Sequence, residues 1–117
     1  MTTFGYARVS TPDQNLDAQE QDLKSAGCQL VFREVESGAK QSRAQLDAML
    51  NVARSGDTII VTSLDRLGRT LSDLIRLITM FEERGINFRS LREQLDTHTA
   101  TGRLVFHVFG AIAEFER

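Results

Sequence analysis

The chain has 117 residues, which fits a single domain because one core typically serves roughly 100–200 residues. Hydrophobic residues make up 41% of it and charged residues 26%, an ordinary composition that excludes collagen-like and disordered proteins. Fourteen Lys and Arg stand against sixteen Asp and Glu, for a net charge of −2. This balance argues against nucleic-acid binding through bulk electrostatics, which needs many cations to neutralise phosphates.

The cysteine count and the apolar runs bear on location. A lone cysteine, Cys28, makes no internal disulfide, so the fold does not depend on an oxidising compartment. Residues 1–6 lack a charged start followed by a long apolar stretch, so we expect no signal peptide. No apolar run approaches the ~18 residues of a membrane span. We therefore expect a soluble, cytoplasmic protein without a membrane partner.

The chain begins with signals for a strand and then a helix. Residues 4–9 are an aromatic and β-branched run, typical of a strand. Thr11 as N-cap, Pro12 at the first helical position and Gln14 as the capping-box partner predict a helix start. We expect this helix to end at Gly27. Its inward residues are expected to be Leu16, Leu23 and Ala26.

A second strand and helix are predicted next. Residues 29–35 read as a strand, and the polar stretch 37–42 reads as a mobile loop because it has a glycine and no periodicity. Residues 43–55 carry apolar side chains at helical spacing. These are Leu46, Met49, Leu50 and Ala53.

The third and fourth strands are predicted on either side of a further helix. Residues 58–62 form a continuous β-branched run, the mark of a strand covered on both faces. Residues 70–73 resemble a capping box in which Asp replaces Glu, and the helix they start is expected to stop near Gly85. Residues 86–91 complete a β-α-β-α-β-α-β order. The order predicts a three-layer α/β domain with a mostly parallel sheet of four to five strands and helices on both faces.

The last segment, residues 101–117, is predicted to be a helix with a wide apolar surface. A helix of this kind at the end of a small domain is expected to cover its own core and a partner's surface. The segment ends in mid-pattern at Arg117, so we expect the chain to be cut within this helix. One face is expected to carry Leu104, Val105, Val108, Ile112 and Phe115, while Phe106, Phe109 and Ala113 widen the apolar surface.

Two turns at the carboxyl ends of predicted strands carry unusual residues. Ser10 lies just before a helix start, where peptide dipoles and free N–H groups favour an anion, and Arg8 points to the same face of its strand. The turn after the third strand brings Asp65, Arg66 and Arg69. Because ligands bind where strand order reverses, we expect the switch point between strands one and three to join the two clusters.

Arginine suits phosphoryl chemistry, because its permanently charged planar fork grips two phosphate oxygens and stabilises developing charge. Several arginines around one serine favour attack on a phosphodiester without metal. The sequence has no Asp/Glu/His set with metal-ligand spacing and no GxxxxGK[ST] loop, so we expect no metal and no cofactor.

Each of these residues also has an ordinary interpretation. Ser10 alone is usually a helix cap, and Asp–Arg pairs in loops are usually solvated ion pairs. Taken alone, Arg43, Arg89 and Gln19 are expected on the surface, and Cys28 as a small buried hydrophobe. Ser63 is a competing nucleophile without the capping context of Ser10, and neither His98 nor His107 has a visible catalytic partner.

Residues 6–11, Tyr-Ala-Arg-Val-Ser-Thr, followed by Gln14 and Gln19, resemble the nucleophile segment of the resolvase/invertase family of serine recombinases. Residues 64–69, Leu-Asp-Arg-Leu-Gly-Arg, resemble the second signature of that family at the right distance. Both motifs together, in a matching order of elements, are highly specific.

The resemblance covers the whole chain. Residues 37–38 with Arg43 resemble the mobile loop of the family, and residues 102–117 resemble the start of its long oligomerisation helix. Residues 84–91 and the Phe-rich final helix look closer to DNA invertases than to transposon resolvases.

The resemblance implies a role for each residue of the two motifs. Ser10 would attack the scissile phosphate and form a 5′-phosphoserine link to DNA. Arg8 and Arg66 would hold the phosphate, Arg69 would stabilise or protonate the leaving oxygen, and Asp65 would orient the arginines or assist proton transfer.

The resemblance also implies a supporting set and an assembly. Gln19 would position neighbouring groups, and Arg43 would enter on its loop when the site assembles. A homodimer would become a homotetramer, which exchanges half-sites and religates DNA without ATP or metal. The expected DNA contacts are Arg43, Arg66, Arg69 and Arg117.

The resemblance also bears on domain organisation. Residues 1–100 would be the catalytic domain and residues 101–117 the start of the oligomerisation helix. A helix-turn-helix DNA-binding domain, which family members carry after that helix, is absent from these residues. We therefore expect the fragment alone not to recombine a site. Two alternatives stay open: another phosphate-handling enzyme on a similar sheet, or a non-catalytic assembly module that uses the last helix.

Overall fold

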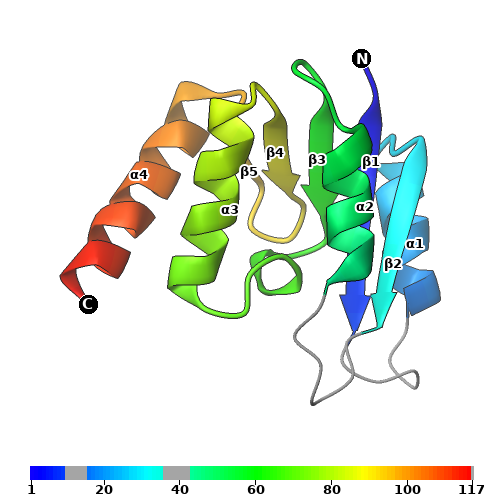
Figure 1. Ribbon diagram of the computed structural model, residues 1–117, viewed down its shortest axis with the longest axis horizontal. Coiled ribbons are helices and arrows are strands. Elements are labelled where there is room, and N and C mark those ends of the chain that lie inside the picture. The colour runs from blue at the N-terminus through cyan, green and yellow to red at the C-terminus, as the bar shows by residue number, and fades with distance from the viewer. Residues whose placement is uncertain (10–15, 36–42, 117) are drawn as a thin grey trace.

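The computed structural model describes residues 1–9, 16–35 and 43–116 (Figure 1). Strands and helices alternate along the chain, as the apolar patterns predict. The elements are β1 (Thr3–Val9), α1 (Leu16–Ser25), β2 (Leu30–Val35), α2 (Ala44–Val52), β3 (Thr58–Val61), the 3-10 turn η1 (Leu64–Arg66), α3 (Leu71–Glu83), β4 (Asn87–Ser90), β5 (Leu95–Asp96) and α4 (Ala100–Phe115).

The strands form one sheet in the order β2-β1-β3-β4-β5. The first four are parallel, with Phe4 of β1 beside both Leu30 of β2 and Ile59 of β3. Since β2 lies on one side of β1 and β3 on the other, the strand order reverses between β1 and β3. The expected switch point is therefore confirmed.

Helices cover both faces of the sheet, which gives the predicted three layers (Figure 1). On one face α1 packs through Leu23 against Ala7 and Ile60, with Leu16 and Ala26 at the margin of this small cluster. On the other face α2, α3 and α4 cover the main core. Its fully buried members include Tyr6, Met49, Ile59, Leu77, Phe81 and Phe88.

Two predicted helix ends are confirmed in detail. Gly27 follows α1 with φ +103° and Gly85 follows α3 with φ +72°, a left-handed backbone that glycine adopts without steric cost. The predicted N-cap of α3 is also present, because the Thr70 hydroxyl accepts the backbone N–H of Asp73 at 3.1 Å. The expected cap of the first helix at Thr11 lies outside the described residues.

The sheet has five strands, within the four to five predicted, and the fifth is one that no segment of the sequence was assigned to. Leu95 and Asp96 pair antiparallel with Ser90 and Arg89 at the edge of the sheet. The turn before them holds Gln94 with φ +55°. Two residues are too few for an alternating pattern to be visible, so sequence periodicity misses this strand.

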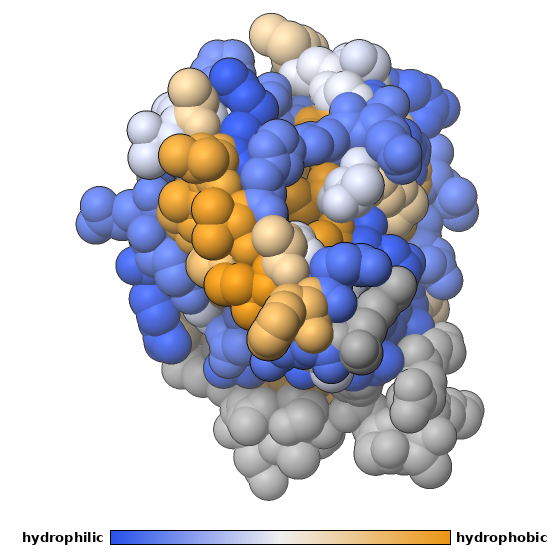
Figure 2. Space-filling model, turned by 90° about the vertical axis from the view of Figure 1, so that its left-hand side faces the viewer, coloured by the Kyte–Doolittle hydropathy of each residue, from blue (hydrophilic) through white to orange (hydrophobic). Residues whose placement is uncertain are grey.

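The last helix starts at Ala100, one residue earlier than expected, and its wide apolar surface is divided between the core and solvent. Thr99 caps it by accepting the N–H of Gly102 at 3.0 Å. Phe106 and Ala113, from the residues that widen the apolar surface, are buried, whereas the other apolar face is solvent-exposed except at the partly buried Val105. A band of apolar surface therefore runs along α4 (Figure 2). Its exposed residues are Leu104, Val108, Ile112 and Phe115.

The environment of Cys28 fits its predicted role as a small buried hydrophobe. The side chain is 8% exposed and lies beneath Gly5, where an added Cβ would stand 3.0 Å from its sulfur. Burial raises the pKa of the Cys28 thiol to about 11. Across the described ranges, no helix has the length and hydropathy needed to span a membrane.

Candidate active site

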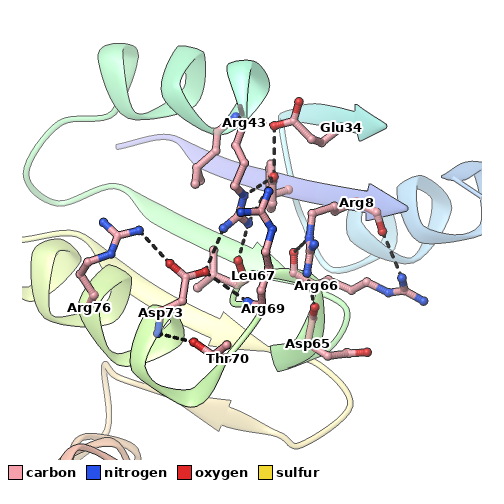
Figure 3. A network of polar contacts seen from close by, with 12 residues as sticks. Arg8, Glu34, Arg43, Asp65, Arg66, Leu67, Arg69, Thr70, Asp73 and Arg76 are labelled. Carbon is pink, nitrogen blue, oxygen red and sulfur yellow. Dashed lines mark hydrogen bonds and ion pairs between the residues drawn. The ribbon is translucent and has the colours of Figure 1, made fainter. Parts of the chain in front are cut away.

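The carboxyl end of β1 and the turn after β3 are tied together by two arginines. The Arg8 guanidinium donates to the backbone oxygens of Asp65 and of Arg66, the latter at 3.0 Å from Nε. In return, Arg66 Nη1 donates to the backbone oxygen of Arg8 at 3.2 Å. Each arginine thus binds the backbone of the segment that carries the other (Figure 3). Arg8, the described member of the first predicted cluster, therefore meets the second cluster, as expected at the switch point.

Gln19 holds Arg8 from the α1 side. Its amide accepts the Arg8 N–H at 3.2 Å and donates to the Arg8 carbonyl at 3.1 Å, so it satisfies both backbone groups of one residue. The side chain is only 8% exposed, so the interpretation of Gln19 as a surface residue is wrong. Arg8 lies two residues before Ser10 in the sequence, so Gln19 fixes the part of the β1 backbone that precedes Ser10.

Asp65 binds a neighbouring hydroxyl through its carboxylate. The Ser63 hydroxyl donates to Asp65 Oδ1, and this bond is the main cause that holds the pKa of Asp65 below its usual value. Ser63 itself is buried. Because it is buried and bonded to a carboxylate, the Ser63 hydroxyl is poorly exposed to a ligand from solvent.

Arg43 is buried between three elements, so its interpretation as a surface charge is wrong. It precedes α2, is 8% exposed, and its guanidinium carbon lies 5.5 Å from the centre of the Tyr6 ring. Its nitrogens donate to the Tyr6 hydroxyl at 3.3 and 3.4 Å, to the Leu67 carbonyl, and to Asp73 at 3.3 Å (Figure 3). The arginine therefore joins β1, α2 and the β3–α3 turn.

Glu34 is a residue of this site that sequence reasoning missed. It is buried on β2, and its carboxylate accepts the backbone N–H groups of Gln45 and Leu46 at the start of α2. It also accepts the Tyr6 hydroxyl at 3.2 Å. Burial is the main cause that raises the pKa of Tyr6 to about 12, so the phenol stays protonated and keeps this bond. Two adjacent charged residues, Arg33 and Glu34, within a predicted strand were the available signal.

Asp73 is the second residue that sequence reasoning undervalued. It was expected only as part of a helix cap, yet its carboxylate accepts the Arg69 N–H at 3.1 Å and pairs with Arg43 and with Arg76. Burial alone would raise the pKa of Asp73, but these donors hold it below its usual value. The carboxylate therefore stays charged at neutral pH.

The turn between η1 and α3 has room for glycine alone at position 68. A Cβ on Gly68 would stand 2.6 Å from Cα of Leu74, a backbone atom that cannot move aside without displacing the helix. The close approach fixes the turn against the first residues of α3. It thereby fixes the spacing between Arg66 and Arg69, which flank Gly68 on either side.

Two of the predicted site residues, Ser10 and Arg117, lie outside the described residues. Within the described ranges, no group of three or more His, Cys, Asp or Glu side chains is arranged to hold a metal ion. The other predicted residues, Arg8, Gln19, Arg43, Asp65, Arg66 and Arg69, all lie at the carboxyl edge of the sheet around β1 and β3 or in contact with it.

Comparison with known proteins gives the family. The model of the resolvase N-terminal domain matches residues 3–117. The chain belongs to the resolvase/invertase family of serine recombinases. It is 52% identical over 116 residues to the transposon Tn552 DNA-invertase BinR of Staphylococcus aureus, covering 97% of this chain and 60% of that protein. It is 50% identical over 114 residues to the serine recombinase gin of Escherichia phage Mu, covering 97% and 59%.

Solved structures agree with this membership. The N-terminal catalytic domain of TP901-1 integrase superposes with a TM-score of 0.82 at 33% identity, over 100% of this chain and 97% of that one. The predicted fold class, a mostly parallel α/β sheet with a further C-terminal helix, is confirmed. The chain spans 60% and 59% of the length of its two named relatives.

Proposed function

We propose that the protein is a site-specific serine recombinase that cuts and rejoins DNA through Ser10. The observation that carries this proposal is the mutual binding of Arg8 and Arg66. Arg8 lies two residues before Ser10 in the sequence. Two cations with a defined geometry, one of them two residues before a serine in the sequence, suit attack on a phosphodiester. Its relatives, which bear the names DNA-invertase and serine recombinase, support the same chemistry.

In the proposed cleavage step, the Ser10 oxygen attacks the scissile phosphorus and the bond from phosphorus to the 3′ oxygen breaks. Ser10 loses its hydroxyl proton and the 3′ oxygen gains one, so the step changes neither the number of protons nor the net charge. The products are a 5′-phosphoserine link and a free 3′-hydroxyl. Because the phosphodiester energy is kept in the link, attack by a 3′-hydroxyl of the exchanged strand reverses the step without ATP.

Arg8 and Arg66 would stabilise the five-coordinate phosphorus. Both guanidiniums now bind neutral backbone oxygens, at 3.0 and 3.2 Å for the two bonds quoted above. A phosphate offers charged acceptors, which form stronger bonds than carbonyls, so DNA would draw these side chains away from the backbone. Arg69 would act at the leaving oxygen, and Gln19 would hold the Arg8 backbone during the exchange.

Asp65 and Arg43 would serve the site from its two sides. With its pKa lowered, Asp65 is a weak proton acceptor and would act by fixing the charge around Arg66. Arg43 supplies a further cation next to Tyr6, two residues before Arg8 on the same face of β1. In this proposal Arg43, Arg66, Arg69 and Arg117 are the DNA contacts.

The exposed apolar band of α4 would bind a second copy of the chain, giving a homodimer that becomes a tetramer when two DNA sites are joined. Its members lie on one helix face, and Phe115 is 90% exposed. A net charge of −2 gives residues 1–117 little general affinity for DNA. We therefore propose that a part of the protein beyond these residues recognises the DNA site. We also propose that the protein acts in the cytoplasm.

The test recovers the covalent intermediate. The full-length protein is produced in cells with a purification tag, denatured, and isolated with any DNA bound to it, and the 5′ ends of that DNA are sequenced. We expect ends at a few defined sites for the wild type and for Ser63→Ala, and none for Ser10→Ala. Adducts that persist in Ser10→Ala, or that vanish only in Ser63→Ala, would overturn the assignment. No adduct in activated wild-type protein would favour the non-catalytic assembly module.

A further inference from the structure

The carboxylate of Asp73 contacts two arginines of the proposed site that come from different elements. Its Oδ2 lies 3.3 Å from Nη1 of Arg43, which precedes α2, and accepts the backbone N–H of Arg69 at 3.1 Å. Its Oδ1 binds the exposed Arg76 at 2.8 Å. Figure 3 shows Asp73 between Arg43 and Arg76 with its oxygens directed at both. The residue thus joins the start of α2 to the β3–α3 turn.

The Asp73 carboxylate supplies the negative charge that faces the buried guanidinium of Arg43. A buried guanidinium is costly unless an opposite charge faces it. The Tyr6 hydroxyl and the Leu67 carbonyl, which also accept from Arg43, are neutral. Among the described residues, Asp73 is the carboxylate that forms an ion pair with Arg43. Removal of that charge would leave Arg43, within the described part of the chain, without a directly paired carboxylate, since Glu34 is separated from it by the Tyr6 hydroxyl.

The side chain of Asp73 is not needed for the helix cap. The cap consists of the backbone N–H of Asp73 and the hydroxyl of Thr70, at 3.1 Å. In a capping box the acidic side chain returns to the N–H of the capping residue itself. The Asp73 carboxylate instead accepts from Arg69, the residue before the cap. A substitution that removes the Asp73 carboxylate therefore leaves the Thr70 cap of α3 in place.

We propose that Asp73 is a positioning residue of the recombination site, which holds Arg43 and the segment of Arg69 in the relative placement that binds the scissile phosphate. This inference rests on the proposed function. Asp73 contacts no reacting atom and acts through the two arginines. Because small errors of placement reduce rates steeply, loss of its charge slows cleavage by roughly 10²-fold.

The first measurement is the rate of adduct formation by the full-length protein on nicked DNA that carries a site mapped as described above. We expect Asp73→Asn to be slowed by roughly 10²-fold. Two matched variants leave the Oδ2 contacts in place: Thr70→Ala removes the cap, and Arg76→Ala removes the outer ion pair. Both are expected to cleave at close to the wild-type rate, although Thr70→Ala lowers the melting temperature. A wild-type rate in Asp73→Asn overturns the inference.

A double-mutant cycle with Arg43→Ala separates positioning from a general loss of stability. If Asp73 acts through Arg43, Asp73→Asn slows the Arg43→Ala protein much less than it slows the wild type. Fully additive losses in the double variant overturn the inference. The fold of each variant is followed by its melting temperature, and Asp73→Glu, which keeps the charge, is expected to recover part of the rate.

A second readout does not depend on catalysis. The Nε–H signal of Arg43 in the NMR spectrum of ¹⁵N-labelled protein is expected to exchange slowly with water in the wild type, Thr70→Ala and Arg76→Ala, and quickly in Asp73→Asn. Unchanged exchange in Asp73→Asn overturns the inference even where cleavage is slow. Absence of a Ser10-dependent adduct in the wild type defeats the proposed function instead, so the two failures are distinguishable.

Discussion

The two edges of the sheet each carry a carboxylate whose pKa is held below its usual value, Asp57 buried and Asp73 partly exposed, and the partners of the two carboxylates differ. At the amino edge, Asp57 precedes β3 and accepts the backbone N–H groups of Thr2 and Arg54, both at 2.8 Å. At the carboxyl edge, Asp73 accepts one backbone N–H and binds the guanidiniums of Arg43 and Arg76. Backbone partners are fixed by the fold, whereas guanidiniums can exchange acceptors.

The difference in partners suggests that the amino edge serves stability and the carboxyl edge serves the proposed reaction. Asp57 closes the amino edge, because it ties residue 2 to the turn before β3. At the carboxyl edge, Arg8 and Arg66 bind carbonyl oxygens that a phosphate can replace. Substitutions at the amino edge are therefore expected to change stability alone, and substitutions of the arginines at the carboxyl edge to change the rate of cleavage.

The largest effect is expected at Arg66. Arg66→Ala removes a cation from the proposed transition state, which typically costs about 10²–10³ in rate. In the folded protein it loses one bond to the Arg8 carbonyl, so the free energy of unfolding falls by only about 1 kcal/mol. Adduct formation on nicked DNA and unfolding in urea measure the two quantities.

The matched control for Arg66→Ala is Arg33→Ala. Arg33 lies on β2, pairs with Asp17 and Glu20 at 2.9 and 3.3 Å, and is half exposed. We expect it to cleave at the wild-type rate. Equal losses of rate in both variants would contradict a specific role for Arg66.

The next largest effect is on stability, at Gly68. Gly68→Ala forces a Cβ to 2.6 Å from the Leu74 backbone, and overpacking of this kind costs about 3 kcal/mol. Gly110→Ala is the control, because its Cβ would meet only Ile75 Cγ2 at 3.6 Å and helical Ala is favoured over Gly by about 1 kcal/mol. Urea midpoints that fall for Gly68→Ala and rise for Gly110→Ala are expected. A change of the urea midpoint in the same direction for both variants would show that the close approach of Gly68 to Leu74 does not limit which residue fits at position 68.

At the amino edge, Asp57→Asn is expected to destabilise the protein by about 1–3 kcal/mol at pH 7, since it weakens two bonds to backbone N–H groups. These bonds hold the pKa of Asp57 below its usual value of 3.8. A lowered pKa contributes stability above pH 3.8, and this contribution fades as the pH falls through the folded-state pKa. The difference between the variant and the wild type should therefore shrink between pH 5 and pH 2, as urea unfolding at several pH values would show.

The comparison of the two edges is sharpened by the cleavage rate of Asp57→Asn. Measured where the protein is fully folded, that rate is expected to equal the wild-type rate. A slowed rate in folded Asp57→Asn would mean that the amino edge also shapes the site.

The smallest effect is expected at Gln94, in the turn between β4 and β5. Its φ of +55° is costly for a residue with a Cβ, so Gln94→Gly is expected to gain about 0.5 kcal/mol. Gln94→Ala keeps the Cβ and is expected to gain nothing. The melting temperatures of Gln94→Gly and Gln94→Ala, each compared with the wild type, would distinguish the two variants. Equal melting temperatures would show that backbone strain at Gln94 does not lower stability.

Much of the fold follows from local signals. Gly27 and Gly85 end their helices with a left-handed backbone, and Thr70 caps α3, each as its position predicts. The order of apolar segments was sufficient for the parallel sheet and its switch point. A fifth strand was allowed for, but the two-residue β5 could not be located, because its pairing with β4 depends on a tertiary contact and not on a repeating pattern.

The candidate site was less accessible to sequence reasoning. Tyr6 and Arg43 are 37 residues apart and Arg43 and Asp73 are 30 apart, so no local spacing relates them. Charged and amide side chains are mostly exposed, so Arg43 and Gln19 looked like surface residues, although both are buried. Family resemblance selected these two residues, and their roles, like that of Ser10, remain predictions.

The buried thiol beneath Gly5 makes this protein a convenient subject for kinetic labelling. Cys28 is the lone cysteine of the chain, and both its burial and its high pKa slow reaction with thiol reagents. The labelling rate is therefore expected to report on opening of the small cluster in which Cys28 packs with Ala7, Leu23 and Ile60. A cysteine introduced on the exposed face of α4 would react much faster, so a fluorophore can be attached there without removal of the native thiol.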